Sequence, residues 1–185
     1  MERSTGGISQ RLDVLASPRI ARVVGVISFA VLTALGARLS VPIVGTAVPF
    51  TFQPLAVLLA GALLGARLGA SSQLLYLGAG LAGMPVFATG TLFAPTGGYL
   101  MAFPFAAFVV GALARGGTRQ NLVALLAGLA VIYTGGVAWL AVLTGWSNAV
   151  ATGILPFILP DLVKVGMAAV ITGMLRERSR DLFGA

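Results

Sequence analysis

The stretch QPLAVLLAGALLGARLGASSQLLYLGAGLAG at residues 53–83 decides the fold, because its 31 residues hold a single charge, that of Arg67. An α-helix of this length would be about 45 Å long, whereas the hydrocarbon core of a bilayer is about 30 Å thick. One crossing would therefore leave much of this apolar stretch outside the membrane. We expect two short crossings, at residues 54–66 and 68–83, joined by a tight hairpin at residues 65–69.

The rest of the chain is equally apolar. Hydrophobic residues make up 58% of its 185 residues and charged residues 9%, and the mean hydropathy is +1.00. A soluble globular domain carries about 25% charged residues, so this protein must expose its surface to lipid. We predict an all-α integral membrane protein that forms a bundle of six transmembrane helices. The other four crossings are expected at residues 23–39, 98–113, 122–143 and 154–175.

The few charges predict how the bundle is oriented. With six crossings and a cytoplasmic N-terminus, ten arginines fall on the inner side and only Arg38 falls on the outer side. Positive residues concentrate in cytoplasmic loops, so we expect both termini in the cytoplasm. The inner arginines are Arg3, Arg11, Arg19, Arg22, Arg67, Arg115, Arg119, Arg176, Arg178 and Arg180.

The same pattern divides the chain into three parts. We expect a basic cytoplasmic tail at residues 1–19, a membrane domain at residues 20–176 and a short cytoplasmic tail at residues 177–185. A signal peptide is the alternative for the first segment, but no small-residue cleavage site follows a short apolar core. The basic tail is expected to remain on the protein and to lie near anionic headgroups.

Missing residue types exclude several classes of function. The chain has no Cys and no His, so it lacks a thiolate nucleophile, an imidazole base and the usual zinc ligands. Its one Lys lies outside any P-loop motif, which excludes a P-loop ATPase. One acid and one lysine within the crossings offer little for catalysis. We expect no enzyme, no metal and no cofactor, and no nucleic acid, because the basic residues lie in loops.

Small residues recur at helical spacing. Ala30 and Ala34 lie one turn apart in the first crossing, and Gly61 and Gly65 do so in the second. Small residues allow helices to approach closely in lipid. The pattern is compatible with packing inside the bundle and with a docking face for another membrane subunit.

Two uncharged outer segments, at residues 41–54 and 84–99, combine Pro and Gly with Thr, Phe and a single Gln or Tyr. Irregular backbone at membrane depth occurs where it is buried in protein or lines a cavity. Hydrophobic surface loops are one interpretation. We favour a lid over an outward-facing small-molecule site, whose apolar walls need only a few polar groups.

Asp161 and Lys164 are the only acid and the only lysine within the crossings. Their i, i+3 spacing places them on one helix face, roughly 21 and 17 Å from the cytoplasmic end of the last crossing. Ionisable residues at such depth are functional candidates. A structural ion pair and a proton relay are the alternatives. We favour the binding of a small solute that is polar at two places and otherwise apolar.

Five short motifs occur in order along the apolar part of the chain. They are VPFTFQ at 48–53, LLGARLG at 63–69, GMPVF at 83–87, PTGGYL at 95–100, and LPF at 155–157 with PDLVK at 160–164. Together they resemble the BioY family, the biotin-specific substrate-binding components of energy-coupling factor transporters. The resemblance covers residues 30–176. The first twenty residues match nothing in it, and Ala94 stands where the family often has Gly.

The resemblance implies biotin capture on the outer face of a bacterial plasma membrane. Asp161 would accept a hydrogen bond from a ureido N–H of biotin, and Lys164 would contact another polar group, preferably the carboxylate. The remaining substrate-binding candidates are the polar residues Gln53, Thr96 and Tyr99 and the apolar residues Phe50, Phe52 and Phe87.

The same resemblance implies partners. Ala30 and Ala34 would contact a transmembrane coupling subunit, and paired cytoplasmic ATPases would supply the energy. The alternatives are a component for a different vitamin and a stand-alone, oligomeric small-solute transporter.

Overall fold

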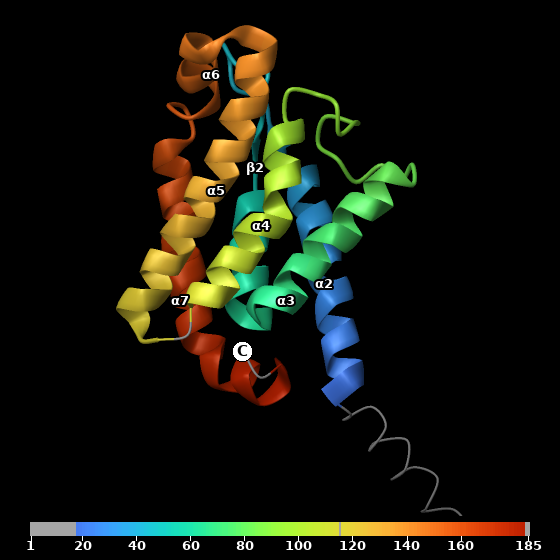
Figure 1. The fold of residues 1–185 in the computed structure, drawn as a ribbon, viewed down its shortest axis with the longest axis vertical. Helices are drawn as coiled ribbons and strands as arrows, with labels where there is room; N and C mark the ends of the chain where they lie inside the picture. The colour runs from blue at the N-terminus through green and yellow to red at the C-terminus, as the bar shows by residue number, and fades with distance from the viewer. Residues whose placement is uncertain (1–17, 115, 184–185) are drawn as a thin grey trace, which may run out of the picture.

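A computed structural model describes residues 18–114 and 116–183 and shows a bundle of apolar helices (Figure 1). The predicted N-terminal tail lies outside this range except for its last two residues, and Arg3, Arg11 and Arg115 lie outside it as well. In chain order the elements are α2 (Pro18–Arg38), β1 (Ser40–Val41), β2 (Phe50–Thr51), α3 (Gln53–Leu81), α4 (Gly97–Leu113), α5 (Thr118–Thr144), α6 (Trp146–Gly153) and α7 (Ile158–Phe183).

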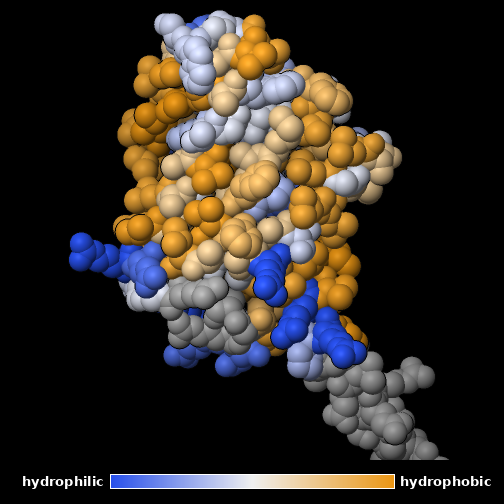
Figure 2. Space-filling view, in the orientation of Figure 1, coloured by the Kyte–Doolittle hydropathy of each residue, from blue (hydrophilic) through white to orange (hydrophobic). Residues whose placement is uncertain are grey.

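The outer surface of the bundle suits a bilayer. Among residues 18–114 and 116–183, four helical segments are long and apolar enough to cross a membrane, and α4 is a shorter apolar helix; the four are Pro18–Arg38, Gln53–Leu81, Thr118–Thr144 and Ile158–Ser179. Large side chains such as Phe105, Val142 and Met174 are 67–80% exposed. Figure 2 shows hydrophobic residues over most of this face and hydrophilic ones at its lower end. The chain is therefore a multi-pass membrane protein.

Helix α3 turns back on itself at Gly65. The backbone there is not helical, with φ of 79° and ψ of 174°. A Cβ atom placed on Gly69 would lie 2.9 Å from the Ala60 carbonyl oxygen and 2.9 Å from the Cα atom of Gly61. Residues eight positions apart in a straight helix are about 12 Å apart, so the two halves of α3 are folded against each other. The reversal lies where the sequence predicted a hairpin (Figure 1).

Glycines allow the reversal of α3 to pack closely against α4. A Cβ atom on Gly111 of α4 would lie 2.2 Å from the backbone nitrogen of Ala66, and one on Gly61 would lie 2.4 Å from the carbonyl oxygen of Ala107. Both distances are shorter than any real Cβ contact, so these positions require glycine. These contacts lie at the turn of α3, whereas the N-termini of α3 and α4 lie at the opposite end of the bundle, beside the loops, which we call the loop end (Figure 1).

The small-residue pair of α2 faces the bundle. Ala30 is 7% exposed and belongs to the core, and Ala34 packs against that core while remaining half-buried. The exposed face of α2 carries larger residues instead, including Val31 and Leu35. The position of Ala30 therefore favours packing inside the bundle over the contact with a coupling subunit that the resemblance implies.

The last helix is longer than predicted. Residues 177–183, expected as a tail, continue α7 as far as Phe183. The Phe183 ring lies over Gly25 of α2, where a Cβ atom would come within 2.9 Å of it, and the Ser179 hydroxyl donates to the Leu63 carbonyl. These contacts with α2 and with the turn of α3 hold the end of the helix in place.

Gly111→Ala should destabilise the protein, because the new methyl group would overlap the backbone of Ala66. Overpacking of this kind costs about 1–3 kcal/mol. Gly166→Ala on α7 is the matched control, since nothing lies within 4 Å of a Cβ atom there. Thermal unfolding of the two variants in detergent checks this. Equal melting temperatures would contradict the close packing of α3 on α4.

Candidate functional site

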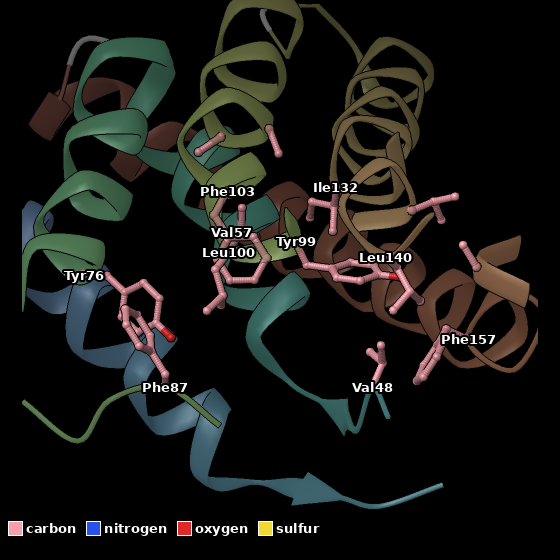
Figure 3. Close-up of a cluster of buried hydrophobic side chains, with 14 of the residues drawn as sticks. Val48, Val57, Tyr76, Phe87, Tyr99, Leu100, Phe103, Ile132, Leu140 and Phe157 are labelled. Atoms are coloured by element: carbon pink, nitrogen blue, oxygen red, sulfur yellow. The ribbon is translucent and has the colours of Figure 1, made fainter. Parts of the chain in front are cut away.

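A cavity lies at the loop end of the bundle. The space between its lining atoms, open solvent included, is about 500 Å³. Figure 3 shows part of its apolar wall, with Val48 near Phe157 and with Tyr99 and Leu100 both on α4. The lining residues are Val48, Pro49, Thr51, Gln53, Pro54, Ala88, Thr96, Tyr99, Leu100, Phe103, Ile132, Tyr133, Phe157, Asp161 and Lys164.

The cavity wall contains a buried ion pair. The Nζ atom of Lys164 lies 2.6 Å from Oδ1 of Asp161, and the two residues are 2% and 4% exposed. They occupy the first two turns of α7, about 4.5 and 9 Å from its first residue, Ile158. A carboxylate in the first turn of a helix is also favoured by the helix dipole. The pair is thus stabilised at the end of α7 that borders the cavity.

Lys164 has further contacts beyond its carboxylate partner. Its ammonium donates to the carbonyl oxygen of Thr51 at 2.6 Å and lies 3.8 Å from the centre of the Phe50 ring. A cation over an aromatic face is attracted by the ring quadrupole. Lys164 therefore joins α7 to β2, which leads directly into α3.

Asp161 also has a second partner, one that the sequence analysis did not identify. The Tyr133 hydroxyl of α5 donates to Oδ2 of Asp161 at 2.7 Å. Tyr133 is one of three tyrosines in the chain and lies in the middle of a predicted crossing. That rarity was the available signal, but the sequence alone could not show which face of α5 meets α7.

Three predicted polar residues line the cavity and are hydrogen-bonded within the protein. The Gln53 amide donates to the Tyr76 hydroxyl at 2.7 Å. The Tyr99 hydroxyl donates to the Gly153 carbonyl at 2.8 Å, and the Thr96 and Thr89 hydroxyls are 2.6 Å apart. The first bond joins the two halves of α3, the second joins α4 to the end of α6, and the third lies within the second loop.

The three predicted aromatic walls have different positions. Nζ of Lys164 lies 3.8 Å from the centre of the Phe50 ring and 5.9 Å from that of the Phe52 ring, and the two rings pack edge-on at 5.5 Å. Phe52 lines a separate apolar groove between α2 and α3, and Phe87 packs edge-on against Tyr76 at 5.5 Å. The structure thus places none of the three on the lining of this cavity. Their place is taken by Phe103 and Phe157, together with smaller apolar residues.

The two loops beside the cavity are tied to the bundle. In the first loop the Thr46 hydroxyl donates to the Thr152 carbonyl at 2.8 Å. The second loop accepts hydrogen bonds from Trp139 at the Ala94 carbonyl, 3.0 Å away, and from the Arg38 guanidinium at the Pro85 carbonyl. Each loop contributes residues to the lining of the cavity.

The chain is similar to known transporters in sequence. The sequence model of the BioY family matches residues 9–181, which includes part of the segment that the five motifs left unmatched. The "Probable biotin transporter BioY" of Pyrococcus horikoshii is 44% identical over 153 residues, covering 80% of this chain and 91% of that protein. The "Biotin transporter BioY" of Thermotoga maritima is 36% identical over 157 residues, covering 80% and 92%.

A solved structure has the same fold. It is described as the S-component for biotin from an ECF-type ABC transporter, and it matches with a TM-score of 0.77. The sequences are 23% identical, and the match covers 86% of this chain and 92% of the other. At this identity the likeness shows a shared fold.

Lys164→Met should destabilise the protein by about 3–5 kcal/mol, because it leaves the Asp161 carboxylate buried without its counter-charge. The double variant Asp161→Asn/Lys164→Met removes both charges and should recover most of that loss. Chemical unfolding in detergent checks both variants. A double variant as unstable as the single one would contradict this account of the pair.

Proposed function

The chain belongs to the BioY family, and on this premise we propose that it binds biotin in the cavity beside Asp161 and Lys164 and serves biotin uptake. The observation that carries the proposal is this cavity, which is apolar over most of its wall and has one buried ion pair. Biotin matches that wall, because it combines an apolar ring and chain with a polar ureido group and a carboxylate.

In this proposal the ion pair recognises the ureido end of biotin. The Asp161 carboxylate accepts a hydrogen bond from a ureido N–H, since an ionised carboxylate only accepts. Lys164 lies 2.6 Å from Asp161 and therefore acts at the same end of the ligand, where it keeps that carboxylate charged, and the ligand carboxylate lies at the far end of its chain. Gln53, Thr96 and Tyr99 hold the surrounding elements in place, and Leu100 and Phe157 pack against the apolar part of the ligand.

The proposed topology has six crossings, with the cavity outside and both termini in the cytoplasm. The two halves of α3 and the helix α4 supply crossings beyond the three long unbroken helices. The turn of α3 carries Arg67, and α5 begins next to Arg119 at the same end of the bundle (Figure 1). Arg38 lies at the opposite end, beside the second loop. This charge distribution supports a cytoplasmic α3 turn.

The proposed setting is a bacterial plasma membrane, and the proposed partners are a transmembrane coupling subunit and cytoplasmic ATPases. A partner is needed for active uptake, because the chain has no P-loop with which to use ATP. Ala34, half-buried at the edge of α2, is the proposed contact for the coupling subunit. Ala30 is covered by the bundle itself.

Purified protein in detergent should bind labelled biotin saturably, and unlabelled biotin but not riboflavin or thiamin should displace it. Asp161→Asn should weaken binding about 10- to 100-fold, since hydrogen bonds to charged groups contribute about 1.5–3 kcal/mol. The matched control is Asp181→Asn, an identical change at an exposed position. Displacement by another vitamin, or no binding by folded protein, would contradict the proposal.

Ala34→Trp should lower biotin uptake by cells while leaving biotin binding by the purified protein unchanged, because a large side chain would obstruct a partner helix. Val142→Trp, at an 80% exposed site on α5, is the control and should preserve both. Uptake assays in cells and binding assays on the purified protein, both made on the same two variants, test this prediction. Loss of binding in Ala34→Trp would instead assign Ala34 to packing inside the bundle.

A further inference from the structure

One polar side chain of the cavity differs from the others in its exposure. Tyr133 is half-buried. The other polar lining residues are all 9% exposed or less; they are Thr51, Gln53, Thr96, Tyr99, Asp161 and Lys164. Among the polar residues of the lining, Tyr133 therefore has the largest exposed fraction.

Of the two residues that are bonded to the Asp161 carboxylate, Tyr133 has fewer contacts than Lys164. Lys164 is held by the Asp161 carboxylate, by the Thr51 carbonyl and by the Phe50 ring. The hydroxyl of Tyr133 donates only to Oδ2 of Asp161. A tyrosine hydroxyl has one hydrogen to donate, and rotation about its C–O bond redirects that hydrogen without movement of the ring. Of the two partners of Asp161, Tyr133 is therefore the one that a ligand can replace.

The two groups that would be released form an adjacent acceptor and donor. When the hydrogen of Tyr133 turns away, Oδ2 of Asp161 becomes a free acceptor, and the hydroxyl 2.7 Å from it becomes a free donor. The complementary ligand edge has an N–H next to a C=O. Cyclic ureas and lactams present such an edge, whereas a carboxylate or an alcohol does not.

We propose that Tyr133 determines specificity by donating to the carbonyl oxygen of a cyclic urea or lactam whose neighbouring N–H donates to Asp161. This inference rests on the proposed function, since it assigns the ureido carbonyl of biotin to Tyr133. Neither protein group is left without a partner by this exchange, because the one hydrogen bond between Tyr133 and Asp161 is replaced by two hydrogen bonds to the ligand. A ligand without the carbonyl would leave the hydroxyl without an acceptor, and buried unpaired groups are costly.

The test compares two ligands and two variants. Biotin has the ureido oxygen, and in 2-iminobiotin a protonated imino nitrogen, a donor, replaces it. Tyr133→Phe should weaken the binding of biotin about tenfold, the value of one hydrogen bond. The same variant should weaken the binding of 2-iminobiotin much less, because the imino nitrogen cannot accept from Tyr133 and can only donate to its phenol oxygen, while the hydroxyl keeps its bond to Asp161.

Tyr99→Phe is the matched control. Its hydroxyl donates to the Gly153 carbonyl and holds α6, so its loss should change the affinity for both ligands by the same factor. Thermal unfolding of both variants confirms that each is folded. A Tyr133→Phe variant that weakens both ligands equally, or neither, would overturn the inference while leaving biotin binding intact. Wild-type protein that binds neither ligand would overturn the proposed function itself.

Discussion

The structure depends on how one pair of charges is accommodated in a bundle surrounded by lipid. An isolated charge in a medium of low polarity is very costly, so Asp161 and Lys164 need counter-charges and hydrogen bonds. The protein provides these from three directions: from each other on α7, from Thr51 on β2 and from Tyr133 on α5. This requirement brings together the start of α3, the middle of α5 and the start of α7. The cavity lies where these elements meet.

The reversal of α3 supplies the scaffold on which this arrangement rests. Gly65 adopts a positive φ that favours glycine, and Gly61 and Gly111 allow backbones to approach where no side chain fits. A pair of short antiparallel segments thereby fills the space of one long helix. Helix α3 begins at Gln53, one residue after the end of β2, so the same element that turns at Gly65 also carries Gln53 to the cavity.

Rare residues made part of this site predictable from the sequence. Asp161 and Lys164 are the only acid and the only lysine in the apolar part of the chain, and the excess length of residues 53–83 required a reversal. The sequence did not show how each helix is rotated about its axis, because these helices are apolar on all sides. That rotation brings Tyr133 to Asp161 and turns Ala30 toward the core.

The structure also changes the interpretation of the aromatic residues. Phe50 and Phe52 pack edge-on at 5.5 Å, and Nζ of Lys164 lies 3.8 and 5.9 Å from their ring centres, while Phe52 also lines the groove beside α2. Residues i and i+2 of an extended strand share a face, which fits this contact, although β2 itself ends at Thr51. Motif similarity located the segment, and the backbone at its end decided the position of each ring.

A structure of the purified protein determined with biotin would show whether biotin occupies the cavity next to the ion pair. We expect ligand density within the cavity, with a ureido nitrogen at hydrogen-bond distance from Oδ2 of Asp161 and the apolar ring against the wall that includes Leu100 and Phe157. Biotin bound elsewhere on the protein, with the Tyr133–Asp161 contact and the cavity unchanged, would contradict this expectation.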